Sequence, residues 1–354
     1  MIAAALELER ALIEIGRAGR ARLRGEHLRG RDDRGGSEAA QAGASVHRNG
    51  VRADDNIAAT LTILAVIARI VANPISNLFQ KQLAHRSAEP LTVIVVTHGL
   101  LSVMAVPILA GQPLGALGGA FWVNMLTSVA LAVVGYLFLW YALRSTDLSI
   151  LGPINAYKAV IGLLLAIVLV GEVPTISGLA GVALIVAGSY VVVDRLPGQA
   201  RHSAFGQFIR EPGVQLRFAA LICSATEAVF LKRALLAASP LTAFLIWTVL
   251  CFALAATGAV LLRKGVVAEV TRLGSEWRTL LWLAATTGLM QLATLVTFGK
   301  LQVGYSLALF QLSALVTVYL GHRYFQERNI RRRLLGSLIM VIGAILIVTL
   351  GRRP

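Results

Sequence analysis

The chain has 354 residues, of which 56% are hydrophobic and only 14% are charged. Soluble domains carry about a quarter charged residues, so this composition argues against a soluble globular protein. The formal net charge of +15 would suggest a nucleic-acid partner in a soluble protein. Here, however, the Lys and Arg residues lie mostly between apolar stretches, as in proteins that cross a bilayer several times, so no nucleic acid is expected.

Residues 1–55 form a distinct N-terminal segment. They contain ten arginines, several acidic residues and many Gly and Ala, without a long apolar run. Such a composition predicts a solvated, disordered tail. Binding of its arginines to anionic lipid headgroups is the alternative, and both interpretations stay open.

From residue 57 onward, apolar blocks recur with the length of a bilayer-crossing helix, about 17 to 25 residues. Alternation with a period of two residues is absent, which excludes a barrel of strands. We therefore expect an all-α integral membrane protein with ten transmembrane helices, multi-pass, in the bacterial inner (plasma) membrane. The predicted spans are Ile57–Phe79, Leu91–Ala110, Gly119–Leu143, Leu148–Val170, Ile176–Val193, Leu216–Leu236, Leu241–Leu262, Leu280–Phe298, Val303–Tyr324 and Leu334–Leu350.

The two halves of this region resemble each other. A Glu-x8-Gly-x6-Gly pattern starts at Glu172 and returns at Glu327, and a Phe-x-Lys pattern starts at Phe79 and returns at Phe230. The common order of these patterns indicates an internal duplication. Because each unit has an odd number of spans, the second copy must enter the membrane from the opposite face. The expected organisation is a first five-helix repeat over 56–194, a connecting loop over 195–215 and a second, inverted five-helix repeat over 216–351.

The block from Leu151-Gly152-Pro153 to Gly171-Glu172 and its glycines, with the returning pattern at Gln326-Glu327, resembles the EamA-type permeases of the drug/metabolite transporter superfamily. The resemblance covers about residues 57–350. It implies ten helices in two inverted repeats and transport of a metabolite whose identity the family leaves open. One departure is that Asn73-Pro74 stands where family members often carry a Trp-Gly pair.

The orientation of the chain stays open. If the N-terminus is cytoplasmic, most loop Lys and Arg residues, including Arg331-Arg332-Arg333, lie on the outer side. The positive-inside rule applied to these short loops then favours both termini outside. The family resemblance implies both termini inside, and the arginines of the tail agree with that.

Three charged residues lie inside the predicted spans and far from their ends: Arg69, Lys158 and Glu227. Charges in the bilayer interior are costly, and they usually face a cavity and have a partner. We expect them to line one central cavity that attracts an anionic or zwitterionic solute. A salt bridge that only holds helices in register is the alternative, and a bridge that opens for substrate would combine the two. Because burial disfavours the charged form of a carboxylate, Glu227 is the candidate for proton coupling.

Uncharged polar residues accompany these charges at helical spacing. Asn73 and Ser76 follow Arg69 on one helix face, and Asn155 lies beside Lys158. Such residues can bind a solute or hydrogen-bond neighbouring helices, and both roles stay open. The residues expected to bind substrate are Arg69, Asn73, Ser76, Asn77, Asn124, Asn155, Lys158, Glu227, Gln291, Thr294 and Gln311.

Residues near the span ends are expected to be structural. Glu172 and Glu327 each precede a helix, where a carboxylate meets the positive end of that helix's dipole. The glycine pairs that follow them let helix backbones approach closely. Lys81 and Lys232 are expected to extend their ammonium groups to the membrane interface.

These features predict a secondary transporter that moves a small polar metabolite, anionic or zwitterionic, such as an amino acid or organic acid, by alternating access. Neither a Walker-type loop nor a metal-ligand cluster occurs in the sequence, so no cofactor, metal or catalytic residue is expected and an enzyme is disfavoured. The alternative is a lipid or lipid-linked solute flippase. Expected partners are the small-molecule substrate, membrane lipids and, through Glu227, protons; the oligomeric state stays open.

Overall fold

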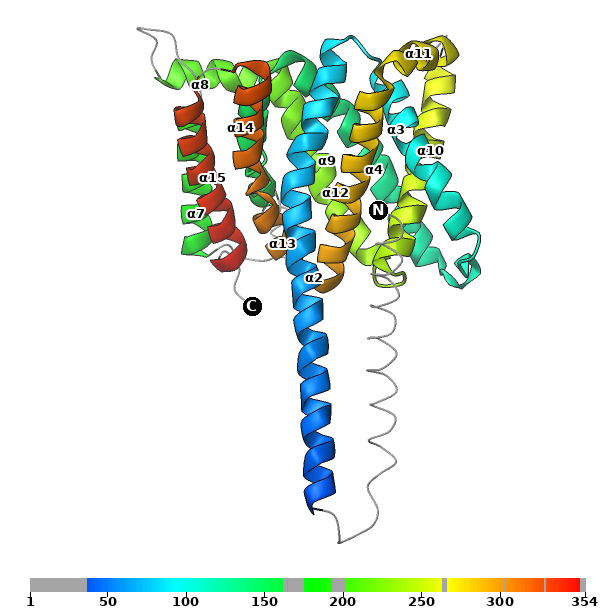
Figure 1. The fold of residues 1–354 in the computed structure, drawn as a ribbon. Helices are drawn as coiled ribbons and strands as arrows, with labels where there is room; N and C mark the ends of the chain where they lie inside the picture. Colours follow the sequence, from blue (N-terminus) through cyan, green and yellow to red (C-terminus); the bar gives the residue numbers. More distant parts are fainter. Residues whose placement is uncertain are drawn as a thin grey trace. The chain divides into compact units, whose positions relative to one another are not determined.

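The computed structural model describes residues 37–161, 164, 175–192, 201–262, 266–301, 303–327 and 329–350. Every regular element in these ranges is helical (Figure 1). The chain divides into two units, Met1–Ala65 and Val66–Pro354. In the first unit, the described residues belong to helix α2 (Ser37–His85), whose residues 66–85 are part of the second unit. Helix α2 thus begins upstream of the start predicted at Ile57, while residues 1–36 of the predicted tail lie outside the described residues.

In chain order, the helices of the second unit are α3 (Pro90–Leu109), η1 (Leu114–Ala116), α4 (Gly119–Ser145), α5 (Leu148–Ile154), α7 (Ile176–Val192), α8 (Arg201–Arg210), α9 (Pro212–Ala234), α10 (Pro240–Leu262), α11 (Val266–Leu273), η2 (Gly274–Glu276), α12 (Trp277–Lys300), α13 (Val303–Phe310), α14 (Ser313–Phe325) and α15 (Ile330–Leu350). The long helices of the second unit coincide with predicted apolar blocks, with shifts of a few residues at their ends, whereas η1, α8, α11 and η2 lie between these blocks.

Six helices in the described residues are long and apolar enough to cross a membrane: Ala59–His85, Pro90–Leu109, Gly119–Ser145, Pro212–Ala234, Pro240–Leu262 and Val266–Lys300. Two further apolar helices, Leu148–Ile161 and Ile176–Val192, are shorter. The protein is therefore a helical, multi-pass integral membrane protein.

Two of the predicted spans are interrupted near their middle. Helix α5 ends directly after Pro153, where the Lys158 amide donates to the Asn155 carbonyl at 2.9 Å, a bond between residues three apart. Between α13 and α14, the Ala314 amide donates to the Gln311 carbonyl at 2.9 Å in the same way. Proline lacks an N–H and disturbs the regular helix ladder, which explains the first interruption. Both interruptions place a polar side chain, Asn155 or Gln311, at a break in a helix.

The region predicted as a connecting loop, residues 195–215, contains helix α8, and α9 begins at Pro212 rather than at Leu216. Proline is favoured at the first position of a helix because the N–H it lacks has no partner there. The earlier start moves Arg217 from the end of the span into its first turns, where its side chain is buried.

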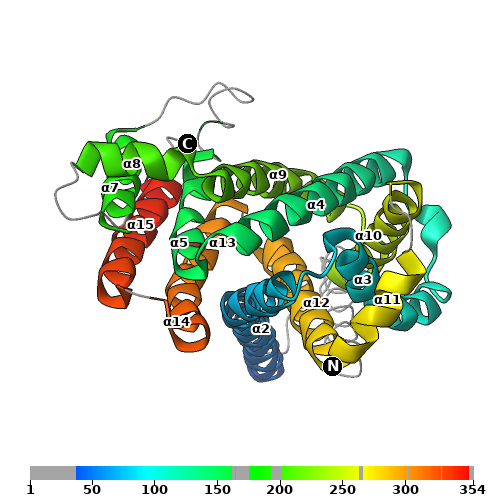
Figure 2. The same cartoon turned by 90° about the horizontal axis from the view of Figure 1, so that it is seen from above.

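Helices of the second unit pack side by side in pairs, α7 with α15, α5 with α14, α3 with α10 and α4 with α9 (Figures 1 and 2). At the α7–α15 contact, a Cβ atom added at Gly181 would lie 2.7 Å from the carbonyl oxygen of Gly343. One added at Gly188 would lie 2.7 Å from that of Gly336. The two helices are therefore antiparallel, and the close approach predicted from the glycine spacing is confirmed.

The distribution of side chains is that of a protein in lipid. Large apolar side chains remain exposed on the outer helix faces, such as Val103, Val123 and Val260 at 74%, 64% and 70% exposure. Polar side chains such as Ser128 and Thr248 are buried between helices. Hydrocarbon chains cover apolar surface at no cost, so the polar groups gather inside the bundle, where they find partners.

Candidate functional site

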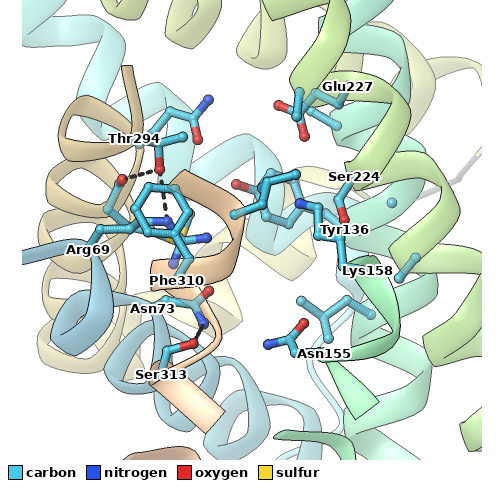
Figure 3. Close-up of a pocket in the computed structure, with 18 of the residues that line it drawn as sticks. Arg69, Asn73, Tyr136, Asn155, Lys158, Ser224, Glu227, Thr294, Phe310 and Ser313 are labelled. Atoms are coloured by element: carbon cyan, nitrogen blue, oxygen red, sulfur yellow. Dashed lines mark hydrogen bonds between the residues drawn. The ribbon is translucent and has the colours of Figure 1, made fainter. Parts of the chain in front are cut away.

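A cavity of about 120 Å³ lies inside the second unit, and polar side chains form much of its wall. Its lining combines residues from both halves of the sequence, which meet across the cavity (Figure 3). The polar lining residues are Arg69, Asn73, Asn77, Gln80, Tyr136, Asn155, Lys158, Arg217, Ser224, Glu227, Gln291, Thr294, Gln311 and Ser313.

Arg69, a residue of α2, occupies one wall of the cavity and contacts α12 and α13. Its Nε donates to Thr294 Oγ1 at 2.8 Å, and its guanidinium carbon lies 4.9 Å from the centre of the Phe310 ring (Figure 3). Its Nη1 is buried without a hydrogen-bond partner. One turn further, Asn73 Nδ2 donates to Ser313 Oγ at 3.5 Å. Arg69 is thus held on one side and keeps a free donor.

The opposite wall carries Lys158 and Glu227, with Tyr136, Ser224 and Asn155 nearby (Figure 3). Lys158 lies within electrostatic reach of Glu227, Arg69 and Arg217. In the part of the chain that the structure describes, however, no ion pair within 4.0 Å joins Glu227 to Lys158 or Arg69. The charges surround a space instead of closing on one another, so the alternative of a closed brace does not describe this arrangement.

Of the eleven residues predicted to bind substrate, nine line this cavity. Ser76 and Asn124 lie outside the lining of this cavity. Ser76 is buried between α2 and α12, where its hydroxyl lies 2.9 Å from that of Thr287. Asn124 Nδ2 donates to the Ala120 carbonyl of its own helix at 2.6 Å. In both cases the polar side chain forms its hydrogen bond with a protein group outside the cavity.

Five polar residues of the cavity are not among the predicted site residues: Gln80, Tyr136, Arg217, Ser224 and Ser313. Arg217 Nη2 donates to Asn155 Oδ1, and its Nε is buried without a partner. Pro212 as a helix start was the available signal for Arg217, because it places the arginine inside the span. Tyr136 carries no comparable signal, since an aromatic residue within an apolar span is compatible with packing anywhere.

A second group of buried charges, the helix-end cluster, consists of Lys81, Glu327 and Arg333. Lys81 Nζ lies 3.0 Å from Glu327 Oε1, and Arg333 Nη1 lies 3.5 Å from Glu327 Oε2. The Glu327 carboxylate also accepts the amides of Leu148 and Ser149, each at 2.8 Å. It therefore caps the N-terminus of α5.

Two predictions about this helix-end cluster need correction. Glu327 meets the N-terminus of α5, far away in sequence, instead of the following helix, because the first amides of α5 need an acceptor. Lys81 does not extend to the interface but is 4% exposed and also donates to the Thr146 carbonyl at 3.2 Å. Glu172 lies outside the described residues.

The surroundings of Glu327, between α14 and α15, also set its protonation. Burial by itself raises the pKa of this carboxyl. The positive charge of Lys81 and the hydrogen bonds from Ser149 outweigh burial, so that the pKa lies below its ordinary value. Glu327 thus stays ionised at neutral pH. Its negative charge and that of Asp147, which lies 3.1 Å from Arg333, compensate the two buried cations Lys81 and Arg333.

Among the described residues, no group of three or more His, Cys, Asp or Glu side chains is placed to hold a metal ion. The polar groups that converge do so around the cavity, on helices of a bundle that crosses the membrane. This combination defines a helical membrane protein with an internal polar cavity.

Residues 60–194 match the model of the EamA-like transporter family, part of the drug/metabolite transporter superfamily. The resemblance predicted from the sequence is confirmed over residues 60–194, and the family that this region resembles consists of membrane permeases of small solutes. A solved structure titled "Crystal structure of protein" superposes with a TM-score of 0.57 at 15% identity, covering 81% of this chain and 96% of its own. Similarity at this level shows the fold alone. No curated protein matches the chain significantly.

Proposed function

We propose that this protein is a secondary transporter of the bacterial inner membrane that moves a small polar metabolite, anionic or zwitterionic, by alternating access. The observation that carries the proposal is the cavity, where Arg69, Lys158 and Glu227 face a common space without contacting one another. Isolated charges inside a membrane protein are functional by default, because their burial must be compensated by a ligand or water.

The proposal includes ten spans arranged as two inverted five-helix repeats, and the helix pairing supports it. Inverted repeats require each helix of one half to run antiparallel to its counterpart in the other half. The α7–α15 contact meets this requirement through its facing glycines. The α5–α14 contact also does, since Gly152 lies against Thr317 and Gly321 lies against Ser149.

The remaining helices extend the same symmetry. Under the exchange of the two halves, α4 with α9 should be mirrored by α12 with α2. Gly135 lies against Cys223 on the first pair. On the second, Ser76 bonds to Thr287 and Arg69 to Thr294. The two walls of the cavity are then counterparts, α2, α12 and α13 on one side and α9, α4 and α5 on the other. Rocking of one half against the other would expose the site to each face in turn.

Uptake into liposomes that contain the purified full chain tests this function. With a panel of amino acids, organic acids, sugars and nucleobases, we expect saturable uptake of at least one anionic or zwitterionic solute. Lys158→Met should abolish this uptake. The matched control is Lys300→Met, at the exposed end of α12, which should behave like the wild type. Movement of a fluorescent phospholipid without uptake of any solute would replace the transporter by a flippase.

Proton coupling through Glu227 is part of the proposal and has its own test. A pH gradient imposed across the liposome membrane should change the uptake rate of the wild type. It should have no effect on Glu227→Gln, which cannot release a proton. Equal responses of the two proteins would remove Glu227 from the coupling.

A further inference from the structure

The cavity wall has an uneven balance of charge. Among the described lining residues, Arg69, Lys158 and Arg217 are cationic, and Glu227 is the single carboxylate. Three positive charges against one negative charge leave an excess of two. A buried excess of this kind is costly unless a bound group of opposite charge compensates it.

The donors left free lie on both sides of the space. Arg69 Nη1 on one wall and Arg217 Nε on the other are buried and without a hydrogen-bond partner. Asn155 and Lys158 lie on the same wall, opposite Arg69 (Figure 3). Because Arg217 donates a hydrogen bond to Asn155, it belongs to the wall of Lys158. One anionic group on the solute would satisfy only one wall. Two anionic groups, one at each end, would satisfy both.

Glu227 sets a further condition. A solute with two carboxylates alone would bring a third negative charge next to the Glu227 carboxylate. A solute that also carries an ammonium group offers Glu227 a partner, as well as hydrogen bonds that are stronger than those between neutral groups. Two carboxylates and one ammonium give each wall and Glu227 a partner of opposite charge, and they lower the excess charge of the cavity from plus two to plus one.

Resting on the transport function proposed above, we propose that the cavity selects an amino dicarboxylate, with one carboxylate at Arg69, the other at Lys158 and Arg217, and the ammonium at Glu227. The cavity has a volume of about 120 Å³ and is suited to a small solute. L-aspartate and L-glutamate have this size and charge pattern, whereas nucleotides and larger peptides do not fit.

The test measures binding of four probes to the purified full chain by isothermal titration calorimetry: L-aspartate, L-glutamate, glutarate and L-glutamine. Glutarate lacks the ammonium of glutamate, and glutamine replaces the second carboxylate by an isosteric amide. At least one of the two acidic amino acids should bind ten times or more tightly than both glutarate and glutamine. Equal binding of glutamate and glutarate, preference for glutamine, or binding of none of the four would overturn the selection.

Two variants assign the preference to its residues. Glu227→Gln should erase the preference for glutamate over glutarate, because the ammonium loses its charged partner. Arg69→Gln should erase the preference for glutamate over glutamine. Arg278→Gln, an exposed arginine of α12 outside the cavity, should leave both preferences unchanged. The same melting temperature without ligand in all four proteins would show that they are folded, and unchanged preferences in folded variants would overturn the assignment.

The failure of this selection and the failure of the transport function give different results. If the liposomes take up a phosphorylated or neutral solute and Lys158→Met abolishes that uptake, the transport function stands and the amino dicarboxylate is wrong. If no solute of the panel is taken up and none of the four probes binds, both proposals fail together.

Discussion

The helix-end cluster and the central cavity hold the same kinds of charged side chain inside one bundle, but they arrange them differently. In the helix-end cluster, one carboxylate contacts two cations, at 3.0 Å for Lys81 and 3.5 Å for Arg333. The side chains of all three residues are at most 5% exposed. In the cavity, Glu227 contacts neither Lys158 nor Arg69 within ion-pair distance.

This difference separates structural charges from functional ones. The helix-end cluster joins the end of α2, the N-terminus of α5 and the segment between α14 and α15, so that each buried charge compensates another. The cavity holds its charges apart on opposite walls and keeps donors unpaired. Burial and charge are alike in both places, so contact geometry is what indicates which group awaits a solute.

The largest effect on stability is expected for Glu327→Ala in the helix-end cluster. The substitution leaves Lys81 as a buried cation without its carboxylate partner and removes the acceptor of two amides of α5. Arg333 also loses one of its two carboxylate partners and keeps Asp147, whose Oδ2 lies 3.1 Å from Arg333 Nη1. Removing one partner of a buried pair costs about 3–5 kcal/mol. We expect a large fall in the melting temperature of the detergent-solubilised protein, with or without solute. Unchanged melting would show that this cluster contributes no stability.

In the cavity, Lys158→Met should reduce transport without lowering stability, the reverse of what Glu327→Ala does. The variant removes a charge that contacts no carboxylate, so the melting temperature without solute should stay the same or rise. Transport should fall by a factor of ten or more, since hydrogen bonds to charged groups are worth about 1.5–3 kcal/mol. Melting curves and uptake rates measured on the same preparation check both halves of this prediction. A large loss of stability would place Lys158 with the structural charges.

Lowering the pH should reduce the stability that the helix-end cluster contributes. The pKa of Glu327 is lower in the folded protein than its unfolded value, about 4.3 for a free Glu side chain. Its contribution to stability is therefore fully present above that value and is lost as the pH falls through the folded pKa. Melting temperatures measured from pH 7 to pH 3 should show a steeper acid loss in the wild type than in Glu327→Gln. Parallel profiles would contradict this assignment.

The smallest effect is expected at an exposed ion pair. Arg86 pairs with Glu276, but the Arg86 side chain is 61% exposed. Water and salt screen such a pair, so exposed pairs contribute little. Arg86→Ala should leave melting and transport indistinguishable from the wild type. A loss comparable to that of Glu327→Ala would mean that an ion pair is stabilising here irrespective of burial.

Much of the helical fold could be predicted from the sequence, because the length of an apolar run and the spacing of glycines are local properties. The glycine spacing indicated the close helix contact that α7 and α15 make, and Pro153 explains the interruption of α5. The second interruption, at Gln311, was not predicted, since no proline or glycine stands there. The predicted start of α9 was late because the apolar pattern begins at Leu216, whereas the helix begins at Pro212.

The site was predicted in part for a similar reason. Arg69, Lys158 and Glu227 could be singled out because a charge within an apolar span is rare, and that signal is readable residue by residue. The positions of Ser76 and Asn124 could not be predicted, because a Ser or Asn side chain forms hydrogen bonds with whichever polar group lies nearest. For Ser76 that partner is Thr287 on a distant helix, and for Asn124 it is its own helix.

The sequence by itself therefore determined that this protein lies in a membrane, that it is helical, which family it resembles and which charged residues lie inside its apolar spans. Each of these follows from composition and short-range spacing. Only the tertiary structure decided which charges touch, because contact between residues such as Lys81 and Glu327, 246 positions apart, depends on how helices pack. It paired one set of charges at the helix ends and held the other apart around a cavity. Packing alone fixes the distances on which that distinction rests.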